Sequence, residues 1–347
     1  MQLQKERVAL LTGGYTAEFE ISIKSAKNVA DKLDRSRFEV YVIHIVPDGW
    51  HYTAPDGSRY EIDKNDFSLS LPQGKVCFDV AFICIHGVPG EDGCLQGYLD
   101  LLSIPYTSCR QQTAALTMNK AFTKAAVSHI PDLHVARSVV INATADAFDQ
   151  FLNAGLAYPV FIKPNTGGSS IGMAKVTDES AALAALTAAL STDYSAQVIA
   201  EEYVMGTEYS VGAFMKDNEV VVLPPSEVIP ESEYFDFDTK YRSAKPIDIT
   251  PGRIAGAELA LLQRLVADIF RTLDCRGVVR IDFIYDHTSS KFFFLEINTI
   301  PGQTDTSFVP KQLRAAGVDV SAFFGQLIDE AYRLSPKPPY NHLSIQR

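Results

Sequence analysis

Strand and helix signals alternate through the first hundred residues, and this order limits the possible fold more than any other feature of the chain. Strand-like apolar runs cover 7–14, 39–46 and 78–87, and helix-like runs cover 21–33 and 95–102. Such alternation predicts βαβ units and a parallel sheet, whose ligands bind beyond the carboxyl ends of the strands. The glycine-rich segments "LTGGYTAE" and "HGVPGEDG" lie at those ends.

Two further regions follow, each with strands and helices of its own. Strand-like runs cover 159–164, 172–176, 196–204, 209–215 and 219–228, and helix-like runs cover 113–127, 178–190 and 257–273. A loop that bears proline and aromatic residues spans 230–250. We therefore expect three domains, which cover residues 1–112, 113–205 and 206–347.

Length and charge narrow the class of protein. The chain has 347 residues, 46% of them hydrophobic, which is enough for separate domain cores. Its 42 acidic and 31 basic residues give a net charge of -11, so we expect no nucleic-acid partner. The N-terminal apolar run is too short for a signal peptide, so we expect a cytoplasmic protein with no membrane partner. The cysteines lack metal-type spacing and are expected to be free thiols.

Two strand-like runs near the C-terminus end in polar residues where a buried strand should be apolar. In "GVVRIDFIYD", Arg280 and Asp282 alternate onto one face, and in "FFFLEINTIPG" Glu296 and Asn298 do the same. A hairpin centred near Ser289 would place Asp282 opposite Glu296, and Arg280 opposite Asn298.

Two facing carboxylates need positive charge between them. At about 4 Å and an effective dielectric of ~20 their repulsion is about 4 kcal/mol. The oxygen donors Asp282, Glu296 and Asn298 favour magnesium or manganese over zinc or copper. An ordinary solvated sheet rim is the alternative, but the alternation, the register and the asparagine together favour a metal site.

The segment "FIKPNTGGSSIGMAKV" predicts a hairpin with a tip rich in amide donors. The backbone amides of Gly167, Gly168, Ser169 and Ser170 could wrap phosphate oxygens, with positive charge from Lys163. A strand follows this loop, whereas Walker A and GxGxxG motifs require a helix there. A plain hairpin turn remains the alternative from this segment alone.

Other polar groups could complete a nucleotide site. Lys120, in a helical stretch, and Lys240, in the 230–250 loop, would add positive charge. In "VIAEEYVMGTEYS", Glu201 could accept from an adenine amino group and the backbone of Glu202 and Val204 could bind the adenine edge, while Glu208 could bind ribose hydroxyls. From this stretch alone, a solvated acidic face is at least as good an interpretation.

Eight stretches in this order resemble the ATP-grasp superfamily, and within it the D-alanine:D-alanine ligase family. They are "LLTGGYTAEFEISIKSA", "HGVPGEDGCLQGYLDLLSIPYT", "MNK", "KPNTGGSSIGM", "EEYVMGTEYSV", "YFDFDTKY", "GVVRIDF" and "LEINTIPGQTDTSFVP". The resemblance covers almost the whole chain. It implies an α/β (α+β overall) fold, in which an N-terminal parallel α/β domain precedes a two-lobed ATP-grasp fold whose 230–250 loop closes over the site.

The resemblance also implies the reaction. A D-alanine carboxylate would attack the ATP γ-phosphate to give an acyl phosphate, and the amine of a second D-alanine would displace phosphate. ATP is then a co-substrate, with two Mg²⁺ or Mn²⁺ ions on Asp282, Glu296 and Asn298. Lys120, Lys163 and Lys240 would add fixed positive charge, and a homodimer is expected.

Substrate-binding and catalytic roles follow from the same resemblance. Glu18 would hold the ammonium of the first D-alanine in a network with Ser169 and Tyr241, and His86 would lie beside the substrate carboxylates. Arg280 and the amide of Gly302 would stabilise the tetrahedral oxyanion. The hydroxyl of Ser307 and the backbone amide of Phe308 would bind the carboxylate of the second substrate.

Rival functions differ in testable ways. D-serine or D-lactate could replace the second D-alanine, although Tyr241 argues against D-lactate. A non-catalytic amino-acid-binding protein would leave the carboxylate hairpin without a purpose, and a nicotinamide-dependent dehydrogenase lacks its GxGxxG motif. The chain departs from the family pattern at Asn119, Phe19 and 107–110. These departures affect loop geometry and remove no catalytic group.

Overall fold

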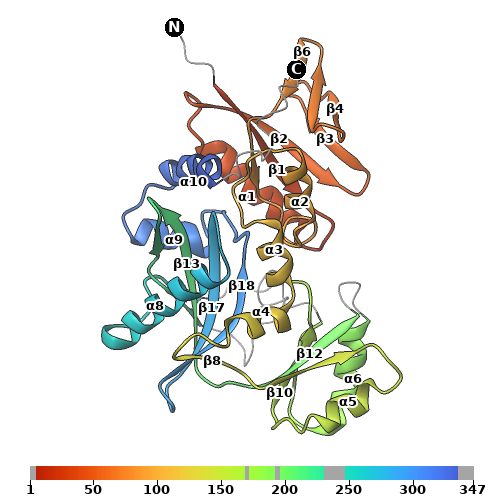
Figure 1. Ribbon diagram of the computed structural model, residues 1–347, viewed down its shortest axis with the longest axis vertical. Helices are drawn as coiled ribbons and strands as arrows, with labels where there is room; N and C mark the ends of the chain where they lie inside the picture. Colours follow the sequence, from red (N-terminus) through yellow and green to blue (C-terminus); the bar gives the residue numbers. More distant parts are fainter. Residues whose placement is uncertain (1–4, 169–171, 192–195, 230–246, 335–347) are drawn as a thin grey trace, which may run out of the picture.

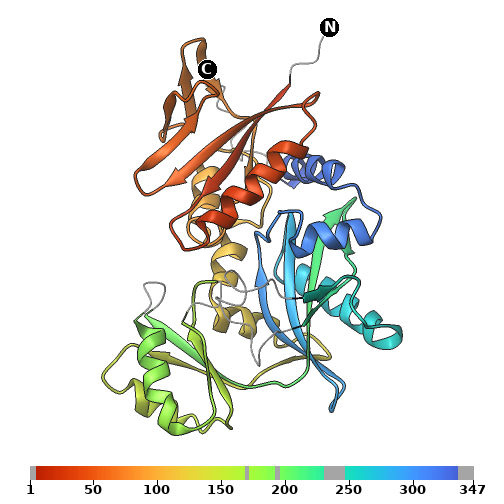
Figure 2. The ribbon, with the colours of Figure 1, turned by 180° about the vertical axis from the view of Figure 1, so that it is seen from behind.

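The computed structural model describes residues 5–168, 172–191, 196–229 and 247–334. Three sheets organise these residues (Figures 1 and 2). The N-terminal sheet lies at one end of the molecule, a smaller four-stranded sheet at the other, and the C-terminal sheet beside the helices that join them. Of the predicted site residues, Ser169, Ser170, Lys240 and Tyr241 lie outside the described residues.

The N-terminal sheet combines a parallel core with an antiparallel extension, in the order β6-β5-β4-β3-β2-β1-β7. Strand β1 runs parallel to both β2 and β7, as the βαβ pattern predicts. Strands β3 to β6 continue the sheet by antiparallel pairing, which the sequence reading missed. The elements are β1 (Glu6–Gly13), α1 (Phe19–Lys32), β2 (Phe38–Val46), β3 (Gly49–Thr53), β4 (Arg59–Asp63), β5 (Ser68–Leu71), β6 (Gly74–Cys77), β7 (Val80–Ile83) and α2 (Cys94–Leu101).

Alternation along β1 explains how two helices cover this sheet. Val8 and Leu10 face the core that α1 completes, whereas Ala9 and Leu11 face the core that α2 completes. Both faces of β1 are therefore buried, which is why its sequence reads as continuously apolar.

The four-stranded sheet is antiparallel, in the order β11-β10-β12-β9, and α5 and α6 share its apolar core. The helical stretch 113–127 is two helices, because Asn119 caps the second with its side chain, which accepts from the Phe122 amide at 3.0 Å. The elements are α3 (Gln111–Met118), α4 (Lys120–Val127), β8 (Leu133–Val135), β9 (Ser138–Asn142), α5 (Ala147–Asn153), β10 (Val160–Pro164), β11 (Ala174–Val176), α6 (Glu179–Leu190) and β12 (Gln197–Glu202).

The C-terminal sheet has the order β16-β15-β13-β17-β18-β8, and β14 pairs with β13. Helix α8 covers it, and β8 joins it from the chain segment before the four-stranded sheet. The elements are β13 (Thr207–Lys216), β14 (Glu219–Val222), β15 (Ser226–Ile229), β16 (Ile247–Ile249), α8 (Gly256–Thr272), β17 (Val278–Asp286), β18 (Lys291–Asn298), α9 (Phe308–Ala315) and α10 (Val320–Leu334).

The two ends of the described chain pack together. Phe323 and Phe324 of α10 share one core with Phe38 and Phe82 of the N-terminal sheet, and α10 lies beside α1 (Figure 2). The N-terminal and C-terminal domains are therefore joined by buried apolar contacts.

The hairpin of β17 and β18 has the register expected at its polar end. Asp282 lies opposite Glu296, and Arg280 lies opposite Asn298. A register shift follows between Asp282 and Phe283, and it was not predicted. The shift changes the pairing toward the turn and leaves the polar pairs in place.

Two simpler expectations can be compared with the structure. All five cysteines, Cys77, Cys84, Cys94, Cys109 and Cys275, are free thiols, as predicted. Within the ranges that the structure describes, no helix combines the length and the apolar character that a membrane crossing needs.

Candidate active site

A large cleft lies between the four-stranded sheet and the C-terminal sheet. It holds about 1610 Å³ of space not filled by protein atoms, including its open mouth. Many residues predicted for the nucleotide and metal sites line it, namely Lys120, Lys163, Gly167, Gly168, Glu201, Glu202, Val204, Glu208, Arg280, Asp282, Glu296 and Phe308. Segments up to 188 residues apart in sequence thus meet in one place, since Lys120 and Phe308 both line the cleft.

Glu201 of β12 lies between two lysines in the cleft wall. Its carboxylate forms ion pairs with Lys163 of β10, at 2.6 Å, and with Lys124 of α4. Burial alone would raise the pKa of Glu201, but the two ammonium groups outweigh it and lower the pKa to about 2. Each carboxylate oxygen of Glu201 therefore pairs with a lysine. The predicted hydrogen bond between Glu201 and the adenine amino group stays a prediction.

The sequence reading did not single out Lys124, although its position carries a signal. It follows Lys120 by four residues, so that both lysines lie on one face of α4. Both line the cleft together with Lys163. The site thus holds more positive charge than predicted.

Lys120 connects α4 to the loop that follows β10. Its ammonium group donates to the carbonyl of Gly167 at 2.6 Å, and its amide donates to the carbonyl of Asn165 at 2.9 Å. Burial lowers the pKa of Lys120, although the charge of Glu296 opposes that effect. Asn119 adds a contact to the same loop, because its side-chain oxygen accepts from Asn165 at 3.1 Å. Asn119, where the chain departs from the family pattern, therefore both caps α4 and contacts this loop.

Some of the groups on β12 that were predicted to bind adenine form hydrogen bonds within the protein. The amide of Glu202 donates to the carbonyl of Arg137 at 2.9 Å, and its carboxylate accepts from the amide of Ala157 at 2.9 Å. Glu202, Tyr203 and Val204 nevertheless line the cleft. Adenine binding by this edge remains a prediction.

Asp282 is the most enclosed of the predicted metal ligands, with 5% of its surface exposed. Arg280 donates to both carboxylate oxygens, with its terminal nitrogen at 2.8 Å from Oδ2. Ser210 donates to Oδ1 at 2.6 Å, and Asn298 donates to Oδ2 at 3.3 Å. Arg280 therefore supplies part of the positive charge that the facing carboxylates require.

The donor set at this end of the hairpin suits a hard cation. Asp282 on β17 lies opposite Glu296 on β18, and Asn298 lies beside Asp282. Carboxylate and amide oxygens are ligands that suit Mg²⁺ and Mn²⁺. Among the described residues, no group of three or more His, Cys, Asp or Glu side chains could hold a metal ion. A site here depends on the two carboxylates and the amide.

Glu18 at the start of α1 points toward the glycine-rich loop. Its Oε2 lies 3.1 Å from the position that a Cβ on Gly168 would take and 3.2 Å from that on Gly87. Glycine at both positions therefore leaves room for the carboxylate. Ser169 and Tyr241, its predicted partners, lie outside the described residues, so the network itself stays a prediction.

Glu91, to which the sequence reading assigned no chemistry, joins the N-terminal domain to the end of β18. It accepts from the amide of Gly87 at 2.9 Å and from the amide of Ile300 at 3.1 Å. Burial and the charge of Glu18 raise its pKa to about 7, although the two amides and Arg280 oppose this rise. Its signal in the sequence was only the turn "GEDG".

His86 follows β7 and is held by two serines of α1. Its amide donates to Ser22 Oγ at 3.0 Å, and its Nε2 lies 3.2 Å from Ser25 Oγ. The histidine is buried, with 6% of its surface exposed. Its predicted place beside the substrate carboxylates is untested.

The segment after β18 brings together the groups predicted for the second substrate. A Cβ on Gly302 would lie 2.7 Å from Ser307 Oγ, so glycine is required for this close approach. Ser307 precedes the first turn of α9, and Phe308 lies under the Arg280 guanidinium, 5.6 Å from its ring centre. The free amides at the start of a helix favour an anion.

Two protein-family models match most of the chain. The model described as D-ala D-ala ligase N-terminus matches residues 7–109, and that described as D-ala D-ala ligase C-terminus matches 123–329. A D-alanine--D-alanine ligase of Porphyromonas gingivalis W83 is 39% identical over 321 residues, or 92% of this chain and 95% of the relative. One from Bacteroides fragilis YCH46 is 35% identical over 328 residues, or 94% and 100%.

Solved structures of the same kind are also similar. The D-alanyl-alanine synthetase A of Vibrio cholerae O1 biovar eltor has a TM-score of 0.85 and 27% identity, with 96% of this chain and 99% of that chain covered. The VanG D-Ala:D-Ser ligase of Enterococcus faecalis has a TM-score of 0.84 and 28% identity, with 94% and 100% covered.

Proposed function

Because this chain belongs to the D-alanine–D-alanine ligase family, we propose that it joins two D-alanine molecules to D-alanyl-D-alanine while ATP becomes ADP and phosphate. The product would serve as a peptidoglycan precursor. The observation that carries the proposal is the meeting of the hairpin carboxylates with a cluster of buried lysines in one cleft.

Phosphoryl transfer would be the first step. The carboxylate of one D-alanine attacks the γ-phosphorus of ATP, the bond to the β,γ-bridging oxygen breaks, and ADP leaves. Lys120, Lys124 and Lys163 would hold the phosphate oxygens, with Lys240 as a further cation, and Ser169 and Ser170 would donate from the loop. Buried ammonium groups are effective here because little water screens them.

The nucleotide base and sugar would lie along β12. We propose that Glu201, Glu202 and Val204 bind adenine and that Glu208 binds the ribose hydroxyls. All four residues line the same cleft, and this supports the proposal: Glu201 and Glu202 lie on β12, Val204 follows it, and Glu208 lies on β13.

Divalent cations fit the polar end of the hairpin. Asp282, Glu296 and Asn298 would hold two Mg²⁺ or Mn²⁺ ions, which when bound neutralise charge on the β- and γ-phosphates. The chemistry of the donors and their placement on neighbouring strands support this assignment.

Amide formation would be the second step. The amine of the second D-alanine attacks the acyl carbon, loses a proton, and phosphate leaves. Arg280 and the Gly302 amide would stabilise the oxyanion, while Ser307 and the Phe308 amide hold the acceptor carboxylate. Glu18 would hold the ammonium of the first D-alanine, and Tyr241 and Ser169 would close the site over it.

D-alanine is the better supported acceptor. The relatives at 35 to 39% identity are named D-alanine--D-alanine ligases, whereas the D-Ala:D-Ser ligase is 28% identical. A cytoplasmic homodimer is our proposal for the working enzyme, and sedimentation equilibrium would test its oligomeric state.

Product analysis tests the proposed function. Purified protein is incubated with ATP, Mg²⁺ and D-alanine, alone or with D-serine or D-lactate, and both phosphate and ligated product are measured. We expect one dipeptide for each phosphate with D-alanine alone. Phosphate release without dipeptide, or a faster reaction with either competitor, would contradict the proposal.

A further inference from the structure

Helix α1 carries a polar stripe on the side that faces the substrate-binding segment. Ser22, Ser25, Asn28 and Lys32 follow one another at intervals of three or four residues, which places them on one side of the helix. Ala26, Val29 and Ala30 belong instead to the apolar core shared with β1 and α10. The stripe is thus separate from the side that stabilises the fold.

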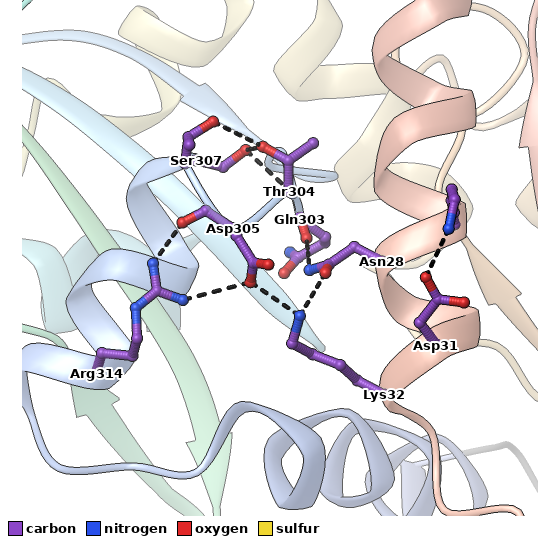
Figure 3. Close-up of polar contacts among 10 residues, drawn as sticks. Asn28, Asp31, Lys32, Gln303, Thr304, Asp305, Ser307 and Arg314 are labelled. Atoms are coloured by element: carbon purple, nitrogen blue, oxygen red, sulfur yellow. Dashed lines mark hydrogen bonds and ion pairs between the residues drawn. The ribbon is translucent and has the colours of Figure 1, made fainter.

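Three residues of this stripe, Ser25, Asn28 and Lys32, hold the segment 300–305, and Figure 3 shows the last two. Ser25 Oγ accepts from the amide of Gln303 at 3.2 Å, and Asn28 Nδ2 donates to the carbonyl of Gln303 at 2.6 Å. The ammonium group of Lys32 lies 2.9 Å from a carboxylate oxygen of Asp305 and also donates to the side-chain oxygen of Asn28. Both backbone polar groups of Gln303 are therefore satisfied from α1.

The same segment is held at both ends. Glu91 accepts from the amide of Ile300 at 3.1 Å, so the N-terminal domain also holds the start of the segment. Arg314 of α9 contacts Asp305 from the opposite side, with one guanidinium nitrogen 3.5 Å from its carboxylate (Figure 3). Asp305 therefore links α1 to α9.

Gly302 lies inside the segment 300–305, and Ser307 is hydrogen-bonded to Thr304 of the same segment. The amide of Thr304 donates to Ser307 Oγ at 3.2 Å, and the two hydroxyls lie 2.7 Å apart. A displacement of Gln303 or Asp305 would therefore move both the Gly302 amide and the Ser307 hydroxyl.

We propose that Asn28 and Lys32 are positioning residues for the acceptor substrate: through Gln303 and Asp305 they hold the Ser307 hydroxyl where the carboxylate of the second amino acid binds and the Gly302 amide where the oxyanion forms. The inference rests on the proposed function, which gives the Ser307 hydroxyl and the Gly302 amide these two roles. In this proposal Asn28 and Lys32 act through Gln303 and Asp305 and not on the substrate directly.

The exposure of the Lys32–Asp305 ion pair makes it possible to distinguish a positioning role from a purely structural role. The Lys32 side chain is 27% exposed and that of Asp305 is 60% exposed. Exposed ion pairs contribute little to global stability, so removing this one should leave the melting temperature nearly unchanged. A small shift of two binding groups, by contrast, directly weakens the site that they form.

Lys32→Met is the main test, and Lys27→Met is its matched control. Lys27 lies on the same helix and pairs with Asp31 at 2.8 Å. Figure 3 shows Asp31 on a side of α1 away from Gln303 and Asp305. Initial rates over a range of D-alanine concentrations give separate donor and acceptor constants. We expect Lys32→Met and Asn28→Ala to raise the acceptor KM about threefold to tenfold, which is ~0.7–1.4 kcal/mol. The KM for ATP should stay unchanged in both variants and the Tm should stay unchanged in Lys32→Met, and Lys32→Arg should restore the acceptor KM.

Ser307→Ala, measured alongside, separates two kinds of failure. A raised acceptor KM in Ser307→Ala with no change in Lys32→Met would overturn the positioning role and leave the proposed function intact. No change in either variant would instead overturn the role given to Ser307, and the positioning role with it. A general loss of kcat, ATP binding and Tm in Lys32→Met would show that the lysine only stabilises the fold.

Discussion

Glu330 of α10 should make the stability of this protein fall as the pH rises. Its side chain is buried, with 3% of the residue surface exposed, and neither carboxylate oxygen has a hydrogen-bond partner among the described residues. Burial raises its pKa from 4.5 to about 8, although Arg333 and Arg276 oppose the rise. The folded state therefore keeps a proton that the unfolded chain releases.

The sign and size of the effect follow from this difference. Below the unfolded pKa of 4.5 both states are protonated, and between 4.5 and about 8 only the folded state is. Each pH unit in that range lowers the free energy of unfolding by about 1.4 kcal/mol. The full shift corresponds to ~5 kcal/mol, a large part of the 5–15 kcal/mol that stabilises a typical protein.

Glu330→Gln removes the titration and keeps the shape of the side chain. Urea unfolding at pH 5 to 9 should give a wild-type free energy that falls with pH more steeply than that of the variant, which should be the more stable protein above pH 8. Glu219→Gln, at an exposed position in β14, is the control and should not separate from wild type. Parallel curves for wild type and Glu330→Gln would refute the assignment of this pKa.

Three further predictions concern the cleft and the acceptor site. Glu296→Gln should keep the fold but raise the Mg²⁺ concentration for half-maximal rate about tenfold or more, since it removes one charged ligand; an unchanged Mg²⁺ titration would remove the metal assignment. Lys163→Ala should raise the KM for ATP about 10- to 100-fold, because a hydrogen bond to a charged group contributes ~1.5–3 kcal/mol. The choice of amino acid should not change, and a selective loss of D-alanine affinity would contradict this prediction. Gly302→Ala should raise the acceptor KM at unchanged ATP affinity, because its Cβ would lie 2.7 Å from Ser307 Oγ; a normal acceptor KM would show that the segment can yield there.

Local alternation predicted the polar hairpin correctly for a physical reason. Side chains two residues apart share a face in any strand, so the grouping of Arg280 with Asp282 and of Glu296 with Asn298 does not depend on the rest of the fold. The register shift between Asp282 and Phe283 does depend on it, because a bulge is set by how the strand twists against its neighbours. The sequence pattern of β17 carries no mark of it.

The antiparallel extension of the N-terminal sheet was missed because its strands are short and partly exposed. β3 to β6 have four or five residues each, and β4 alternates between exposed and less exposed positions along 59–63. Polar residues at such positions resemble loop sequence. The strands β1 and β7 are apolar on both faces and were therefore easy to find.

The family of the chain was identified correctly from its motifs, and the comparisons confirm it. The electrostatics of the cleft were harder to predict from the motifs. Glu201 was read as a nucleotide-binding acid, but its partners Lys124 and Lys163 come from α4 and β10. The spacing of Lys124 after Lys120 could have suggested the first lysine, whereas the meeting of α4 with β12 depends on tertiary structure.

The clamp on the acceptor segment shows the limit of sequence reading most clearly. Ser25, Asn28 and Lys32 read as an ordinary polar side of an amphipathic helix, which usually faces solvent. Their partners Gln303 and Asp305 lie 273 to 278 residues further along the chain. The packing of α10 against α1, together with the burial of Ile300 in the core of the N-terminal sheet, brings the two segments together. These apolar contacts share no residue with the stripe. The apolar side of α1 therefore fixes the domain arrangement, and its polar side converts that arrangement into the position of Gly302 and Ser307. A substitution between α1 and α10 that shifts the helix without unfolding it should consequently change acceptor binding before it changes ATP binding.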